Sequence, residues 1–237
     1  MKKVMDRRIL NNIELYFTPS AMRDNNILRI EGEELNHILK VMRHKKGDEL
    51  YITDGEGCIF KTYITNISSH SVETVISDEF NYENKTRNLY FCIPKLKSTD
   101  RFETALEKCT ELGITNFIIY ESERTIAKSS KMERWEKIVI SAMKQSLRSF
   151  VPRINVVESL NEIIMQNGNK ILFLQEAEKM FTTDAINGSR DNYFIFGPEG
   201  DFTENEKKLF DKAEFYNLGD SRLRSETAII KCASIIS

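Results

Sequence analysis

The sequence contains few of the residues that form metal centres or disulfide frameworks. Its 237 residues include four Cys and three His, and Cys58, Cys92, Cys109 and Cys232 form no C-x-x-C pair. This pattern favours neither a structural zinc site nor a set of disulfides. Ten Gly and four Pro are also too few for a collagen-like or Pro/Gly-rich disordered chain. We therefore expect a folded chain that carries no metal.

Long apolar runs are absent from the sequence as well. The longest, such as 118–120 and 171–174, fall far short of the ~20 residues that a membrane-spanning helix requires. The charged N-terminal residues lead into Asn11 and Asn12 and not into the apolar segment of a secretory signal. We therefore expect a cytoplasmic protein without a membrane span.

Three common catalytic and nucleotide-binding motifs are missing too. No G-x-G-x-x-G follows the first strand of the second half, and no G-x-x-x-x-G-K-[ST] occurs. No G-x-S-x-G is present, and His37, His44 and His70 all lie in the first third of the chain. These absences argue against a dinucleotide-binding fold, a P-loop NTPase and a serine hydrolase.

The net charge of −2 hides an uneven distribution along the chain. Residues 1–80 carry −2, residues 81–160 carry +4 and residues 161–237 carry −4. A phosphate backbone responds to local potential, so a near-neutral total does not exclude a basic face. Ordinary scatter explains the same numbers, and charge alone favours scatter.

The first eighty residues have the pattern of a small β-barrel. Alternating and β-branched runs predict strands at 13–17, 49–53, 58–67 and 71–76. One helix is expected at 33–43, with Leu35, Ile38, Leu39 and Met42 on one face and Gly47 as its stop. The polar stretch 81–88 is interpreted as a linker.

From residue 89 onward, short apolar strands alternate with amphipathic helices. Helices are expected at 101–112 and 131–148 because apolar residues recur there at helical spacing. This alternation predicts an α/β domain with a parallel sheet covered on both faces. The expected strands are 89–93, 114–120, 154–157, 171–174 and 193–196.

The loop at 196–206 joins a buried strand to a helix. Thr203-x-x-Glu206 is a capping box that marks the helix start. Gly197 and Gly200 allow a ligand to approach the backbone closely, and Pro198 fixes the turn between them. Ligands of open α/β sheets bind at the carboxyl ends of strands, where this loop begins. A tight turn without a ligand explains these residues equally well.

A second polar loop, 217–228, has the same position between a strand and a helix. Arg222, Arg224 and Glu226 lie within it, with hydroxyls at Ser225 and Thr227. The hydroxyls could simply cap the last helix, and Arg224 and Glu226 could form a surface ion pair worth little. Two such loops at the same sheet edge nevertheless favour a binding pocket more strongly than either loop does by itself.

Basic residues gather in four places along the chain. Each group alone is typical of a solvated surface. Groups that bracket a pocket would suit a phosphate backbone that leads a base to it. The groups are His37, Lys40, Arg43, His44, Lys45 and Lys46; Lys95, Lys97 and Arg101; Arg134, Lys137, Lys144 and Arg148; and Arg222 with Arg224.

Six motifs in a fixed order give the chain a family resemblance from about residue 13 to the C-terminus. They are H-x-x-K-V-x-R from His37 with Gly47-Asp48, E-K-x-T-E-L-G from Glu107, R-W-x-K-I from Arg134, Q-S-x-R from Gln145, G-P-E-G from Gly197 and L-R-x-E-T-A from Leu223. With these motifs the sequence resembles the RsmE family of 16S rRNA methyltransferases in the SPOUT (trefoil-knot) superfamily.

The resemblance implies a fold and an activity. Residues 1–80 would contain an N-terminal extension and a PUA-like β-barrel that binds RNA, and 81–88 would link it to a SPOUT α/β domain at 89–237. The last segment of that domain would form a trefoil knot. The implied protein is a homodimer that binds S-adenosylmethionine near its interface. It would methylate N3 of one uridine of 16S rRNA in the small ribosomal subunit.

The resemblance also implies residue roles. Arg224 and Glu226 would be catalytic, Arg224 by steering phosphate or stabilising a uracil oxyanion. RNA would be contacted by His37, Arg43, Lys95, Lys97 and Arg148. The cofactor would be bound by Leu174, Gly197, Pro198, Glu199, Gly200, Leu218, Gly219, Leu223 and Ser225.

One residue departs from the family pattern near the expected cofactor loop. Asp201 stands where the family usually has a second Gly, and Asp tolerates a positive φ better than most residues. Two alternatives remain at this point. The chain could methylate another RNA, such as a tRNA ribose. It could also be a non-catalytic RNA-binding or ribosome-assembly protein, for which Asp201 is the only support.

Overall fold

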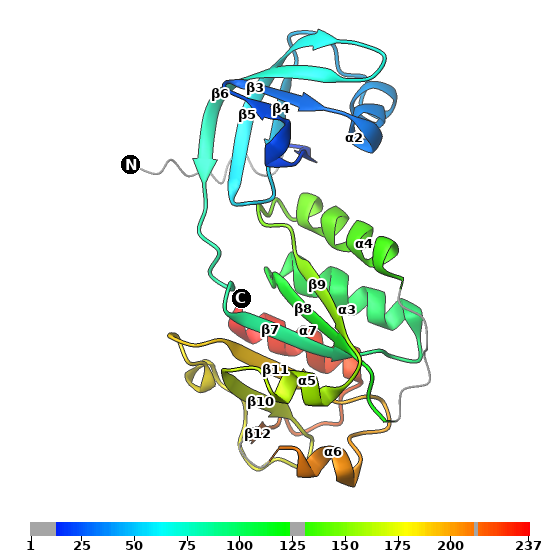
Figure 1. The fold of residues 1–237 in the computed structure, drawn as a ribbon, viewed down its shortest axis with the longest axis vertical. Helices are drawn as coiled ribbons and strands as arrows, with labels where there is room; N and C mark the ends of the chain where they lie inside the picture. Colours follow the sequence, from blue (N-terminus) through cyan, green and yellow to red (C-terminus); the bar gives the residue numbers. More distant parts are fainter. Residues whose placement is uncertain (1–12, 124–130, 211–212) are drawn as a thin grey trace. The chain divides into compact units, whose positions relative to one another are not determined.

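The computed structural model describes residues 13–123, 131–210 and 213–237, and they form two compact units (Figure 1). The first unit consists of the chain up to Asn84 together with Met143–Val151. The second consists of Lys85–Ala142 and Pro152–Ser237. The expected domain ranges had placed residues 143–151 with the second half of the chain.

The first unit is a curled six-stranded sheet. Its strand order is β1-β4-β5-β6-β3-β2, with β1 and β4 parallel and the other pairs antiparallel. Register shifts between β5 and β6 bend the sheet, as β-bulges do. The strands are β1 (Leu15–Phe17), β2 (Arg23–Asp24), β3 (Ile27–Ile30), β4 (Glu49–Thr53), β5 (Cys58–Ile67) and β6 (Val72–Asn81).

A short helical segment covers the apolar core of this sheet. It consists of α2 (Gly32–Asn36) and one π-helical turn, η2 (His37–Val41). A separate 3-10 turn, η1 (Ser20–Met22), precedes β2. The expected stop at Gly47 is wrong, because Arg43 already has a left-handed φ of 58°. His44 N–H then donates to the Ile38 carbonyl at 3.0 Å, which ends the helix as in a Schellman motif.

The segment Met143–Val151 completes the first unit from a distant part of the sequence. Val151 N–H donates to the Gly55 carbonyl at 2.9 Å, and Gly57 N–H donates to the Ser149 carbonyl at 2.8 Å. Gly55 has a φ of 75°, and a Cβ there would lie 2.4 Å from the Val151 side chain. Only glycine therefore allows this close approach.

The second unit is built on the parallel sheet that the sequence predicts. Its order is β12-β10-β11-β7-β8-β9, and every neighbouring pair is parallel. The first strand of the unit, β7, is therefore internal, and the three last strands lie side by side. The strands are β7 (Leu89–Pro94), β8 (Asn116–Tyr120), β9 (Arg153–Val157), β10 (Asn169–Phe173), β11 (Asn192–Phe196) and β12 (Glu214–Tyr216).

Helices cover both faces of this sheet, so its strands are apolar on both sides (Figure 1). One face packs against α3 (Thr99–Glu111), α4 (Met132–Gln145) and α7 (Ser225–Ile236). The other packs against α5 (Leu160–Ile164) and the segment around α6 (Glu204–Lys208), and η3 (Thr183–Ala185) is a 3-10 turn. No helix in the described ranges has the length and apolar character to cross a membrane.

Candidate functional site

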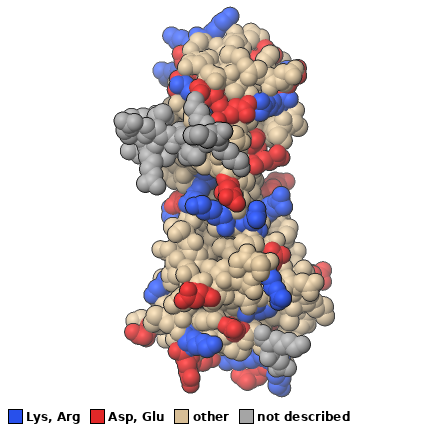
Figure 2. Space-filling model, turned by 90° about the vertical axis from the view of Figure 1, so that its left-hand side faces the viewer, with Lys and Arg blue, Asp and Glu red and all other residues tan. Residues whose placement is uncertain are grey.

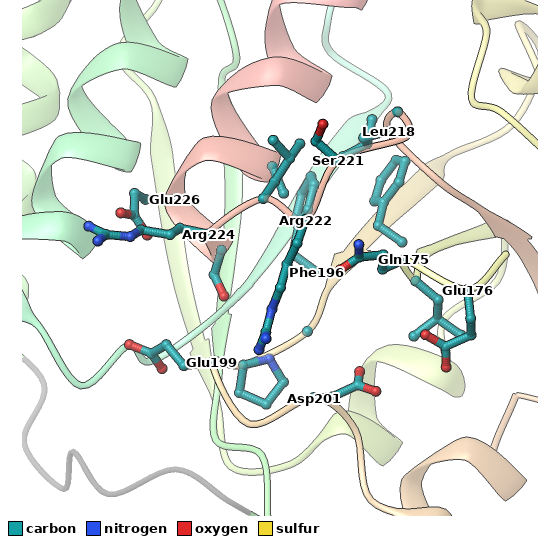
Figure 3. Close-up of a pocket in the computed structure, with 18 of the residues that line it drawn as sticks. Gln175, Glu176, Phe196, Glu199, Asp201, Leu218, Ser221, Arg222, Arg224 and Glu226 are labelled. Atoms are coloured by element: carbon teal, nitrogen blue, oxygen red, sulfur yellow. The ribbon is translucent and has the colours of Figure 1, made fainter.

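A pocket lies at the carboxyl ends of the three adjacent strands β12, β10 and β11. Its volume of about 650 Å³ lies within the range of roughly 300–1,000 Å³ that is usual for small-molecule sites. The loops that follow the three strands form its walls (Figure 3). The first turn of α7 and Arg101 of α3 also line it. This is the sheet edge at which α/β proteins bind their ligands.

The loop after β11 brings backbone close to the pocket. The buried Tyr120 hydroxyl donates to the Phe196 carbonyl at 2.6 Å and holds the end of the strand. Burial raises the pKa of Tyr120 well above its usual value, so the phenol stays a donor. A Cβ on Gly197 would lie 3.2 Å from the Phe202 ring, so a larger residue would disturb this wall.

The turn that follows explains the departure at Asp201. Asp201 has a φ of 61°, and its N–H donates to the Pro198 carbonyl at 3.0 Å. Its carboxylate accepts the Phe202 N–H at 2.8 Å. Asp suits this left-handed position better than most non-glycine residues. The predicted capping box of Thr203 and Glu206 is confirmed, and α6 begins directly after it.

The loop between β12 and α7 forms the opposite wall. The Asn217 side chain donates to the Ala177 carbonyl at 2.7 Å and accepts the Gly219 N–H at 3.2 Å. Gly219 has a φ of 135°, and a Cβ there would lie 2.9 Å from the Lys231 ammonium. Leu218 is buried beside it, so the loop presents an apolar side chain and the backbone of a glycine to the pocket.

The same loop and the first turn of α7 also bring charged side chains to the pocket. Arg222 crosses the pocket toward the loop that carries Glu199 and Asp201, whereas Arg224 extends beside Glu226 (Figure 3). The Arg101 Nε lies 3.5 Å from Glu226 Oε1. Glu226 Oε2 is buried and has no hydrogen-bond partner among the described residues. A buried oxygen of this kind requires an explanation, such as a catalytic role or a bound water.

The structure places all the predicted cofactor and catalytic residues at this pocket except Gly200. Gly200 is exposed in the same turn but does not line the cavity. Sequence reasoning assigned no site role to Phe173, Gln175 and Glu176, which follow β10. The end of that strand was a usable signal, because β10 lies between the two strands whose loops were singled out. The other lining residues without a predicted role are Arg101, Phe196, Asp201, Ser221, Arg222 and Ala228.

Three of the predicted RNA-binding residues lie in the first unit. Arg43 and Arg148 are exposed. The His37 ring lies edge-on to Tyr16 at a centroid distance of 5.8 Å, and its Nε2 is 3.9 Å from Glu14. All three side chains are accessible to solvent. Arg43 has further exposed cations near it in the sequence, Lys40, Lys45 and Lys46.

The other two predicted RNA-binding residues lie in the second unit and differ from each other. Lys95 is only 6% exposed, and its ammonium forms an ion pair with Glu121 at 2.6 Å. Lys97 is exposed, and its backbone N–H donates to Glu199 at 3.0 Å. On the face drawn in Figure 2, acidic and basic side chains are both present over each unit.

Comparison with known proteins defines the class. Residues 83–237 match the family model of the RNA methyltransferase domain, and residues 30–77 match that of the RNA methyltransferase PUA domain. The chain belongs to this family of RNA methyltransferases.

Relatives along nearly the whole chain make the class more specific. The chain is 30% identical over 238 residues to the ribosomal RNA small subunit methyltransferase E of Bacillus subtilis (strain 168), with 93% of each chain covered. It is similar to the solved structure of a probable rRNA-methyltransferase from Porphyromonas gingivalis, with a TM-score of 0.83, 29% identity and coverages of 94% and 97%. It is also similar to the ribosomal RNA small subunit methyltransferase E from Neisseria gonorrhoeae bound to S-adenosyl methionine, with a TM-score of 0.80, 27% identity and coverages of 94% and 96%.

Proposed function

We propose that the protein transfers a methyl group from S-adenosylmethionine to N3 of one uridine in 16S rRNA of the small ribosomal subunit. The observation that carries this proposal is the pocket itself, which gathers the residues of the G-P-E-G and L-R-x-E-T-A motifs at one sheet edge. The similarity to the two named ribosomal RNA small subunit methyltransferases supports the same activity.

The pocket residues fit S-adenosylmethionine. Phe196, Leu218 and Leu223 offer apolar walls for a neutral purine, and the backbone of Gly197 and Gly219, which carries no side chain, would approach its polar edge. The cofactor supplies a methyl group that is already activated on its sulfonium. The protein therefore has to orient the uridine and assist the loss of its N3 proton.

We assign the proton loss to Glu226 and a supporting role to Arg224, which both line the pocket. The unpartnered Oε2 of Glu226 would accept the N3–H proton, and Arg101 Nε lies 3.5 Å from the other oxygen of the same carboxylate. Arg224 would donate to the uracil oxygen that gains negative charge as the proton leaves. Loss of the proton would free the N3 electron pair of the uridine for the methyl group that the cofactor would supply.

Arg43 is the best supported RNA contact in the first unit. It occupies a left-handed position where glycine is usual, with a φ of 58°, and its side chain is exposed. A strained non-glycine residue that contributes no core contact is typical of a functional position. We propose His37, Lys97 and Arg148 as further contacts and leave out Lys95, which is committed to Glu121. The target base would leave its stack to enter the pocket.

We also propose that the active protein is a homodimer in the cytoplasm, as in the family that its motifs resemble. The ribosomal substrate determines the compartment. Light scattering on the purified protein would give twice the monomer mass of 27.6 kDa. A monomeric mass together with full activity would contradict the dimer alone.

The decisive experiment uses labelled S-adenosylmethionine and small subunits from cells that lack the modification. We expect label in 3-methyluridine at a single position of 16S rRNA, identified by nucleoside mass spectrometry and mapped by nuclease protection. Label found in tRNA instead would show that tRNA, and not 16S rRNA, is the methyl acceptor. Cofactor binding without transfer to any RNA would favour a binding protein that has lost the reaction.

A further inference from the structure

Arg222 lines the pocket and forms no ion pair among the described residues. The ion pairs around the pocket in the described residues join Arg101 to Glu226 and Lys207 to Glu176 and Asp201, and none includes Arg222. The remaining carboxylate, Glu199, accepts the backbone N–H of Lys97 at 3.0 Å. None of the carboxylates that line the cavity in the described part of the chain is therefore paired with the Arg222 guanidinium.

The position of Arg222 directs this charge into the cavity. Its side chain leaves the loop before α7 and crosses the pocket toward the loop after β11 (Figure 3). Arg224, two residues later, extends instead beside Glu226 at one side. The two arginines of one loop thus point to different parts of the site, and Arg222 faces the space that a small molecule would fill.

The chemistry of the pocket predicts a ligand with a neutral flat part and one carboxylate. Phe196, Leu218 and Leu223 form apolar surface, whereas Arg222 offers a planar fork of donors. A guanidinium binds a carboxylate with two parallel hydrogen bonds, which adds both affinity and orientation. A purine nucleoside that carries an amino acid satisfies both requirements.

We propose that Arg222 binds the α-carboxylate of the amino-acid portion of the methyl donor, and so selects nucleosides that carry this group. This inference rests on the proposed function. The contact would fix the sulfonium end of the donor relative to the uridine. Arg222 is therefore a specificity-determining residue, distinct from Arg224, which faces the reacting base.

Binding measurements with two nucleosides test the proposal. S-adenosylhomocysteine has the α-carboxylate, and 5′-methylthioadenosine is the same type of thioether without the amino acid. We expect Arg222→Gln to lower the affinity for S-adenosylhomocysteine at least about tenfold, because a charged hydrogen-bonded contact is lost. Calorimetry measures this affinity. The affinity of the same variant for 5′-methylthioadenosine should stay within twofold. Arg222→Lys should weaken S-adenosylhomocysteine less than Gln does.

Arg153→Gln provides the matched control, since Arg153 is exposed on β9 and does not line the pocket. It should bind both nucleosides as the unchanged protein does, and all variants should share one melting temperature within about a degree. An equal loss for both nucleosides in Arg222→Gln would overturn the proposal. So would unchanged nucleoside affinities with weaker RNA binding, which would make Arg222 a phosphate contact. If the unchanged protein binds neither nucleoside, the proposed function itself fails.

Discussion

The two units offer different chemistry to the ligands proposed for them. In the second unit, backbone at Gly197 and Gly219 and apolar side chains enclose a cavity. In the first unit, Lys40 of η2 and Arg43 and Lys45 of the turn that follows are exposed cations. A neutral nucleoside is selected by shape, whereas a polyanion is attracted by charge. A single substitution in the pocket should therefore reduce cofactor affinity strongly. A single substitution in the turn should reduce RNA affinity only in part.

The largest effect should come from placing a side chain on Gly197, in the loop after β11 that lines the pocket. Gly197→Val places a branched side chain where even a Cβ lies 3.2 Å from the Phe202 ring. We expect S-adenosylhomocysteine binding to be abolished in calorimetry. Gly188→Val is the control, because nothing lies within 4 Å of a Cβ there. Normal binding by Gly197→Val would move the cofactor away from this loop.

The next largest effect is expected at Arg224, where a substitution should lower the rate of methyl transfer and leave the affinity for the cofactor nearly unchanged. Arg224→Ala removes the donor proposed for the uracil oxygen. We expect single-turnover methylation to fall about 10²–10³-fold. Affinity for S-adenosylhomocysteine should change by no more than a few fold. If cofactor binding falls in parallel with the rate, Arg224 belongs to the cofactor wall and the proposed division between the two arginines is wrong.

The turn of the first unit should respond through salt-dependent RNA affinity. Arg43→Ala removes one phosphate contact, so the slope of log affinity against log salt should fall by about 0.9 on duplex RNA regions. Filter binding at several salt concentrations measures this slope. Nucleoside binding in the pocket should be unaffected. A slope equal to that of the unchanged protein would remove Arg43 from the RNA surface.

The smallest effect concerns the strain at the same turn. Arg43→Gly relieves a left-handed residue, and the free energy of unfolding should rise by about 0.5–1 kcal/mol. Chemical denaturation measures this change. Lys45→Gly, three residues before Asp48 in the same turn, has no positive φ to relieve and should give no gain. Stabilisation by both variants would point to a general effect of glycine in the turn.

Local patterns determine how far the sequence predicted this structure. Alternating strands and helices identified the parallel sheet, since each strand is buried on both faces. The two polar loops were correctly assigned to one sheet edge because parallel strands align their carboxyl ends. The C-terminal knot stays a prediction of the resemblance, as do the roles of the individual site residues.

The features that sequence reasoning missed depend on partners distant in the chain. Lys95 resembles any lysine after a strand, and only its neighbour Glu121 at the end of β8 explains its burial. The segment Met143–Val151 continues the apolar periodicity of α4 in the sequence. Its hydrogen bonds with Gly55 and Gly57 join it to the first unit, and no local pattern indicates them. Helix α5 is five residues long, which is too short for a periodic signal.

The order of the strands has a consequence for the synthesis of the protein. All six strands of the first unit have been made once residue 81 leaves the ribosome, but the pocket also needs Ser225–Ala228 at the start of α7. Helix α7 packs on the same core as α3, which is made more than a hundred residues earlier. A ligand stabilises only a state that can bind it. The nascent parallel sheet must therefore assemble without help from the cofactor, which can stabilise only the finished chain.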